Sequence, residues 1–227
     1  TSYYYNEPAM SVVLERAPAT LTLACAALLI SVVLGIPAGI VAAVKRNSVS
    51  DAVIRVLALL GQCMPAFWLG IMLIMLFAVK LGWMPTGGAE DGLRSLILPA
   101  FTLGVFSAAT ICRLLRSNLI EVLGKEYIDV AKAKGLPKSK IIGKHALKNA
   151  MSSIITILGM QFASLLGGSV ITEQVFAWPG VGRLVIQSIT TSDFAVVECI
   201  VFLMAVIFVV INFIVDVLYC VINPRVR

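Results

Sequence analysis

Long uncharged stretches are the feature that most constrains the fold of this chain. Five of them run between charged residues and are 17 to 24 residues long: 21–44, 56–79, 95–112, 149–172 and 199–215. An α-helix needs about 20 predominantly apolar residues, within a range of roughly 17 to 25, to cross the hydrocarbon core of a bilayer. The chain is 59% hydrophobic and 13% charged, whereas soluble domains are about 25% charged. We therefore expect an all-α membrane protein, with five spanning helices in a single domain, 1–227.

Basic residues are distributed unevenly between the two sides of this predicted bundle. Fourteen of the 18 Lys and Arg residues fall on the side that holds segment 126–148. Cytoplasmic loops of membrane proteins collect Lys and Arg, so we expect this side in the cytoplasm, the N-terminus outside and the C-terminus inside. The net charge of +6 then needs no nucleic-acid partner. The chain is expected to cross a lipid bilayer several times.

This orientation places an external segment, 1–17, before the first predicted span. No initiator Met, basic n-region or signal-type cleavage site accompanies it, although something must carry it across the membrane. We expect an additional N-terminal helix in the full subunit, which would then have six spans. The alternative is a short N-terminal tail that the first span translocates by itself.

Proline and glycine residues mark departures from straight helices. Pro65 lies within the second predicted span and predicts a kink, which neighbouring helices tolerate by satisfying the freed backbone groups. Between the last two spans, 175–195 is predicted as an external loop. In this loop Trp178–Arg183 (WPGVGR) is expected to form a tight turn that begins a short helix over 184–189.

Enzymatic chemistry finds little support among the polar residues. The only histidine, His145, lies in the basic segment and far from any intramembrane nucleophile in the predicted topology. The five cysteines are scattered singly, so neither a disulfide framework nor a metal site is indicated. We expect no catalytic residue, no bound metal and no cofactor in this chain.

Among the polar residues of the predicted spans, three with amide side chains are candidates for a transport path: Gln62, Gln161 and Asn212. Such residues line transport paths or tie neighbouring helices together, and both interpretations remain open. Gln62 lies close to Pro65, and Gln161 lies in a span rich in small residues. Both positions favour the interpretation that these residues line a transport path.

The basic segment 126–148 has the pattern of a bent helical hairpin. Tyr127, Ile128 and Ala131 recur at helical spacing, and Gly135 suits a left-handed helix end. Ser139 is expected to cap a second helix that continues into the fourth span. The spacing equally suits a mechanical contact with a partner or a basic hairpin that rests on anionic lipid.

A family resemblance favours the first of these interpretations. Residues 127–136 (YIDVAKAKGL) and 145–150 (HALKNA) resemble the EAA-type signature of ABC importer permeases, and more narrowly that of the dipeptide, oligopeptide and nickel family. The resemblance extends over essentially the whole chain. It includes 61–65 with Phe67, 81–85 (LGWMP), 97–99 (ILP), Glu173 with Val175 and Phe176, 178–182 (WPGVG), 216–219 (DVLY) and Asn223 with Pro224.

The resemblance implies a type I ABC importer transmembrane domain in which 126–148 forms the coupling elbow. The coupling helix of such permeases docks in a groove of a cytoplasmic ATPase subunit. Carried over by position, Ala131 would allow close packing, Gly135 would form the turn and Leu136 would offer an apolar contact. Asp129 stands where the general signature has Glu. The coupling residues are then Glu126, Asp129, Ala131, Lys134, Gly135 and Leu136.

The implied function is that of a transport subunit without catalysis of its own, in a bacterial cell (inner) membrane. It would pair with a homologous permease and form the path for peptides or a related small solute. Two ATPase subunits would carry ATP and Mg, and an external solute-binding protein would deliver the ligand. The alternative is a self-sufficient secondary transporter, for which an internal inverted repeat and several midplane charges are expected; the sequence shows neither. The particular solute stays open.

Overall fold

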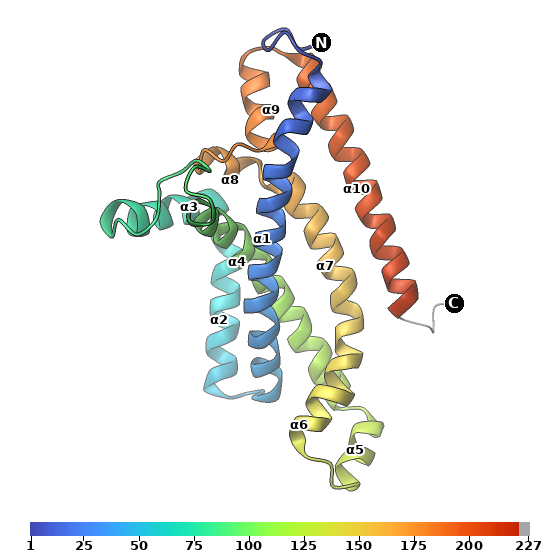
Figure 1. Ribbon diagram of the computed structural model, residues 1–227. Helices are drawn as coiled ribbons and strands as arrows, with labels where there is room; N and C mark the ends of the chain where they lie inside the picture. The colour runs from blue at the N-terminus through green and yellow to red at the C-terminus, as the bar shows by residue number, and fades with distance from the viewer. Residues whose placement is uncertain (223–227) are drawn as a thin grey trace.

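The structure, a computed structural model, describes residues 1–222, except for the side chains of 152, 153, 168, 216 and 218–222. Arg225 and Arg227, which the charge count places inside, lie outside the described residues. Helices account for nearly all of the described part. Four long ones form an elongated bundle (Figure 1): α1 (Ala9–Val44), α4 (Leu93–Leu123), α7 (Lys148–Gly168) and α10 (Phe194–Ile222).

Three to five segments of the described residues are long and apolar enough to cross a membrane. Helices α1, α4 and α10 each meet this criterion alone. Two bent pairs add one span each if each pair counts as a single crossing. The all-helical membrane fold expected from the sequence is thus confirmed, and the number of crossings depends on how the bent pairs sit in the bilayer.

Small residues bring α1 and α4 into close contact along most of their length. A Cβ added at Gly35 would lie 2.7 Å from the Ala108 carbonyl oxygen, and one at Gly104 would lie 2.9 Å from the Ala27 carbonyl oxygen. Membrane helices pack through such small residues because the backbones can then approach each other. The α1–α4 pair forms the centre of the bundle, against which the other helices pack.

The second predicted span is bent far more than a kinked helix. Helix α2 (Val49–Cys63) is followed by α3 (Ala66–Leu73) and a π-helical stretch, η1 (Ile74–Lys80), at an angle of 102°. Pro65 disfavours a helical conformation of the residue before it, and Met64 accordingly has extended torsion angles. The expected break at Pro65 is confirmed, but the expectation of one continuous crossing over 56–79 needs correction, because α3 and η1 leave the bundle sideways (Figure 1).

The fourth predicted span divides at one end. Helix α7 stops at Gly168, and a short helix, α8 (Val170–Val175), follows it. Helix α9 (Val181–Thr190) then packs on the N-terminal part of α1 and on the start of α10. The short helix predicted over 184–189 is confirmed and is longer than expected.

The basic segment forms a separate projection at the opposite end of the bundle (Figure 1). It comprises α5 (Glu126–Ala133), α6 (Lys138–Lys140) and a π-helical stretch, η2 (Ile141–Leu147), which continues into α7. Helix α4 leads into it and α7 leads out of it, so the projection lies at the ends of two long helices.

Candidate functional site

One glycine makes the turn of the elbow. Gly135 follows the end of α5 and has a φ of 73°. Its amide donates to the Lys132 carbonyl at 2.9 Å, and the Leu136 amide donates to the Ala131 carbonyl at 3.3 Å. This pair of bonds is a Schellman motif, which satisfies the last carbonyls of a helix and favours glycine at the left-handed position. The predicted left-handed glycine is confirmed.

The second limb of the elbow begins two residues earlier than expected. Pro137 occupies the position before the first helical residue, Lys138, and its ψ of 144° keeps it outside the helix. Ser139 therefore lies inside the helix and does not cap it, which corrects the sequence prediction. The missing amide hydrogen of a proline suits a helix start, where that group has no intrahelical partner.

The inward face of the elbow is apolar and packs on the bundle. Ile128 and Ala131 are buried in a cluster that includes Leu119, Ile141 and further residues of α4, η2 and α7. Leu136, expected to offer an apolar contact to a partner, is half-buried, packs against this cluster and borders a cavity of about 390 Å³. These residues hold the elbow to its own helices.

The outward face is charged, with one apolar side chain among the charges. Glu126, Asp129 and Lys134 are exposed, and Val130 is 54% exposed. Asp129 pairs with Lys132 at 2.7 Å, an exposed pair of the kind that adds little stability. Sequence reasoning missed Val130 because the apolar stripe was assigned to Tyr127, Ile128 and Ala131. The sequence did not show which side of this short helix the bundle covers.

Two polar ties fix the helices that carry the elbow. The Tyr127 hydroxyl accepts a hydrogen bond from Asn149 Nδ2 at 2.9 Å and thereby joins α5 to α7. Arg116 on α4 donates to both carboxylate oxygens of Asp51 on α2, at 2.7 and 2.8 Å. Asp51 is fully buried. Sequence reasoning missed this pair because Arg116 was counted only as one of the basic residues on the cytoplasmic side.

A cavity of about 400 Å³ that has several polar groups on largely apolar walls, called the polar cavity below, lies between α2, α4 and α7. Gln62 and Gln161, two of the three path candidates, both line it. The Gln62 amide donates to the Thr110 hydroxyl at 2.9 Å. Hydroxyl groups add to the polar lining, from Thr102, Ser107 and Ser164. A chamber with amide and hydroxyl groups on apolar walls can accept a polar solute.

Asn212 does not join this cavity. It lies on α10, and its Nδ2 donates to the Phe208 carbonyl of the same helix at 2.8 Å. The residues that line the cavity come from other helices. The structure therefore separates Asn212 from the two glutamines with which the sequence analysis grouped it.

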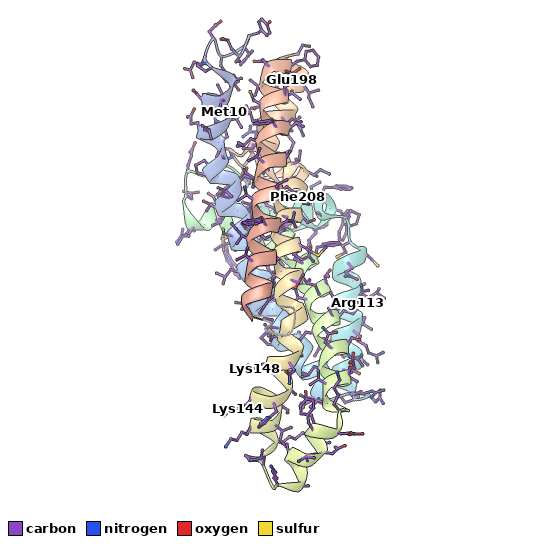
Figure 2. The ribbon with its side chains drawn as sticks, turned by 90° about the vertical axis from the view of Figure 1, so that its right-hand side faces the viewer. Met10, Arg113, Lys144, Lys148, Glu198 and Phe208 are labelled. Carbon is purple, nitrogen blue, oxygen red and sulfur yellow. The ribbon has the colours of Figure 1, made fainter. Side chains whose placement is uncertain are left out.

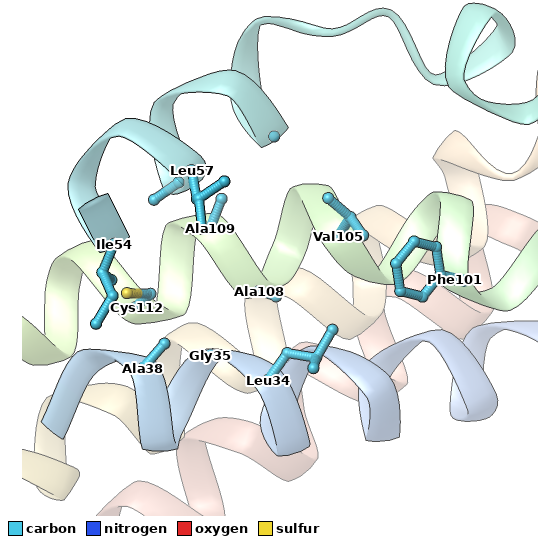
Figure 3. A pocket seen from close by; sticks show the side chains of 12 residues that line it. Leu34, Gly35, Ala38, Ile54, Leu57, Phe101, Val105, Ala108, Ala109 and Cys112 are labelled. Atoms are coloured by element: carbon cyan, nitrogen blue, oxygen red, sulfur yellow. The ribbon is translucent and has the colours of Figure 1, made fainter. Parts of the chain in front are cut away.

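A second cavity separates α2 from the central helices. It has a volume of about 390 Å³, and Figure 3 shows side chains of α1, α2 and α4 around it, including Leu34, Leu57 and Val105. Its lining is apolar. Helix α2 is held to α4 by the Asp51–Arg116 pair at one end and by the Gln62–Thr110 bond near the other, with this unfilled space between the two ties.

A buried carboxylate organises the end of the bundle opposite the elbow. Glu173 on α8 is fully buried and accepts hydrogen bonds from the hydroxyls of Thr20 and Ser169, at 2.8 and 2.9 Å. Its second oxygen accepts from the Arg183 amide at 3.0 Å, in the first turn of α9. The carboxylate therefore caps α9, where a negative charge is favourable.

The Trp-Pro-Gly-Val-Gly stretch makes this arrangement possible. Trp178 donates from Nε1 to the Ala19 carbonyl at 2.9 Å and so fixes the turn to α1. A Cβ at Gly180 would lie 2.3 Å from Glu173 Oε2, so only glycine leaves room for the carboxylate there. The turn predicted from the sequence has a definite structural role that its pattern alone did not reveal.

The fold resembles that of chains in solved ABC transporters. A chain of the MetNI methionine ABC transporter in an inward-facing conformation superimposes with a TM-score of 0.82 at 20% identity, over 96% of this chain and 99% of that one. An amino acid ABC transporter with histidines gives a TM-score of 0.74 at 17% identity. At these identities the likeness concerns the fold.

Sequence comparison identifies the family. The sequence model of a protein family, the binding-protein-dependent transport system inner membrane component, matches residues 35–227 of this chain. A putative peptide transport system permease protein of Brucella abortus (strain 2308) is 41% identical over 100% of this chain and 74% of its own length. The glutathione transport system permease protein GsiC of Escherichia coli (strain K12) is 42% identical over 98% of this chain and 72% of its own length.

The chain belongs to the family of binding-protein-dependent transport system inner membrane components. It is a permease subunit of an ABC transporter, and the ATPase activity resides on separate subunits. The resemblance inferred from residues 127–136 and 145–150 is thereby confirmed, and the self-sufficient secondary transporter is set aside.

Proposed function

We propose that this subunit forms, with a homologous permease, the translocation path of an ATP-driven importer for peptides or a related small solute such as glutathione. Support for this solute class comes from the relatives, which are named as peptide and glutathione transport permeases. An external binding protein would deliver the solute, and two ATPase subunits would bind ATP and Mg. The chain itself would hold no cofactor.

The observation that carries the proposal is the elbow at the ends of α4 and α7. Its inward face is buried in the cluster around Ile128, so the elbow and the two helices form one packed unit. Its outward face offers Glu126, Asp129, Val130 and Lys134 to a partner. A force applied to that face by ATPase closure would be transmitted along α4 and α7 to the polar cavity, which both helices line.

The proposed orientation places the elbow in the cytoplasm, together with the α1–α2 connection. Figure 2 shows Lys144 and Lys148 at the elbow end and Glu198 near the opposite end. Accumulation of basic residues at one end supports a cytoplasmic location for that end. We further propose five crossings, in which each bent pair serves as one broken span.

The cavity between α2, α4 and α7 is proposed as part of the path. Gln62 and Gln161 face it together, which supports the path interpretation over simple helix packing. The assembly would alternate between two states that differ in their affinity for the cargo. The binding protein and ATP would shift the balance between these states, because each binds one state more tightly than the other.

Reconstitution tests the proposed function. The complete transport complex in proteoliposomes, with its binding protein outside and ATP inside, should accumulate a labelled dipeptide or labelled glutathione. Omission of ATP or of the binding protein should abolish accumulation. Uptake of either solute without ATP, driven by an imposed ion gradient, would contradict the proposal.

A further inference from the structure

A small polar cavity lies at the end of the bundle opposite the elbow. It occupies about 230 Å³ where α1 meets the start of α9, and its lining consists of Arg16, Pro179, Gly180, Arg183, Leu184 and Gln187. Two guanidinium groups from distant parts of the sequence thus share one cavity. The transport function proposed above makes no use of them.

Neither arginine has an acidic partner among the described residues. The ion pairs of that part of the chain involve other side chains, and no carboxylate oxygen lies within 4 Å of the guanidinium nitrogens of Arg16 or Arg183. Arg183 donates from Nη1 to the Ala177 carbonyl at 2.7 Å. Because two like charges in a shared cavity repel each other, an anion between them would lower the energy of this site.

The remaining polar groups nearby are already engaged. Glu173 lies behind Gly180 and accepts three hydrogen bonds, one of them from the Arg183 amide. The Val181 amide donates to the Thr20 hydroxyl at 2.8 Å. The start of α9 is therefore capped from within the protein, and binding of an anion would rest on the two arginine side chains.

The depth of Arg16 indicates the source of the anion. Arg16 and Lys45 bound the uncharged part of α1 and are separated by 29 residues. At 1.5 Å per residue this is about 43 Å, and a bilayer including its headgroups is about 40–45 Å thick. With Lys45 at one surface, Arg16 lies in the headgroup layer of the other surface, where lipid phosphates are the abundant anions.

We propose that Arg16 and Arg183 bind the phosphate of an anionic phospholipid such as phosphatidylglycerol. Guanidinium groups form paired hydrogen bonds with phosphate oxygens, and the cavity joins α1 to α9. In the orientation proposed above, this lipid belongs to the outer leaflet. The bound lipid would stabilise the contact between these two helices.

Native mass spectrometry of the purified transport complex, released from nanodiscs, tests the site. With phosphatidylglycerol nanodiscs, the wild-type complex should retain lipid, and Arg16→Gln with Arg183→Gln should lower its affinity by roughly tenfold for each arginine. Arg94→Gln is the matched control, since Arg94 is exposed near the same end and lies outside the cavity. Arg16→Gln alone keeps the test valid if loss of the Arg183–Ala177 bond impairs folding.

Thermal unfolding of the same complex distinguishes the sources of phosphate. Added phosphatidylglycerol should raise the unfolding temperature of the wild type more than that of Arg16→Gln. Equal stabilisation by inorganic phosphate alone would overturn the assignment to a lipid. Equal lipid retention by the wild type and the double variant would overturn the site itself.

Discussion

Gly180 allows the turn before α9 to pack directly against the buried Glu173 carboxylate, at the end of the bundle opposite the elbow. Glu173 is fully buried, and its hydrogen bonds leave it no freedom to move away from Gly180. Gly143 carries no such constraint. A Cβ at Gly143, in η2, would meet nothing within 4 Å. The two positions therefore provide a matched comparison.

Gly180→Ala should destabilise the subunit, by about 1–3 kcal/mol, because the added methyl group would overlap the Glu173 carboxylate. Gly143→Ala should leave stability unchanged or slightly increased, since alanine favours helix more than glycine does. Denaturant unfolding of the purified protein in mixed micelles measures both. Equal stability of the two variants would show that the carboxylate is not held against this turn.

The two glutamines of the polar cavity are expected to act on transport rather than on assembly. If both line the path, Gln161→Leu should alter uptake rate or solute preference with little loss of folded complex. Gln62→Leu should alter transport as well, and it should also cost roughly 1 kcal/mol of stability because the bond to Thr110 is lost. If they only tie helices together, each change should cost roughly 1 kcal/mol of stability and leave uptake per complex unchanged. Uptake normalised to purified complex separates the two results, with Asn212→Leu as a control outside the cavity.

At the scale of elements, α2 is attached to the bundle mainly by polar ties. The apolar cavity between α2 and the central helices leaves part of its inner face without contacts. The Asp51–Arg116 pair and the Gln62–Thr110 bond lie on either side of that space. Beside the second tie the two helices approach each other closely, since a Cβ added at Gly61 would lie 3.1 Å from Val105 Cγ1.

Arg116→Gln should lower the free energy of unfolding by about 2 kcal/mol, because the fully buried Asp51 would lose the closer of its two arginine partners and keep only Arg55, at 3.4 Å. Arg113→Gln, at an exposed arginine three residues earlier, should change it by no more than about 0.5 kcal/mol. The double variant Asp51→Leu with Arg116→Leu should recover most of the loss, since it removes both charges. A double variant less stable than Arg116→Gln would contradict this account of the pair.

Much of the element structure could be predicted from the sequence, because uncharged runs and glycine positions carry strong local information. The spans around α1, α4 and α10, the left-handed Gly135 and the helix after Trp178 all follow from local pattern. The 102° bend after α2 could not be predicted, since a proline forbids a straight helix without setting the new direction.

Side-chain partners at the candidate site were harder to predict, because they depend on which faces the bundle covers. Leu136 faces inward and Val130 outward, although both are apolar residues of one short segment. Arg116 was counted as a cytoplasmic charge, and only the packing of α2 on α4 reveals its partner, Asp51. Asn212 matches Gln62 and Gln161 in type but lies on a different helix from the cavity.

At the scale of the whole molecule, the proposed orientation predicts which loops are accessible from outside. In a cysteine-free background, Thr86→Cys and Ser192→Cys should react with an impermeant thiol reagent added to intact cells, and Lys138→Cys should not. All three positions are exposed in the structure, so accessibility depends on the side of the membrane. External labelling of Lys138→Cys would reverse the orientation and remove the elbow from the cytoplasm.

The central claim is that the outward face of the elbow receives the movement of the ATPase subunits. Val130→Glu tests it directly, because Val130 is 54% exposed and the change leaves the buried cluster under the elbow intact. Val49→Glu is the matched control: Val49 is 80% exposed, begins α2 and lies off the elbow. Uptake and ATP hydrolysis are measured together in the reconstituted complex.

Val130→Glu should reduce uptake at least tenfold, which corresponds to about 1.4 kcal/mol or more of lost contact energy. The complex should still assemble in the membrane, and stimulation of ATP hydrolysis by the binding protein should be lost. Val49→Glu should retain both activities. Normal uptake with stimulated ATP hydrolysis in the Val130→Glu complex would contradict the coupling role of the elbow.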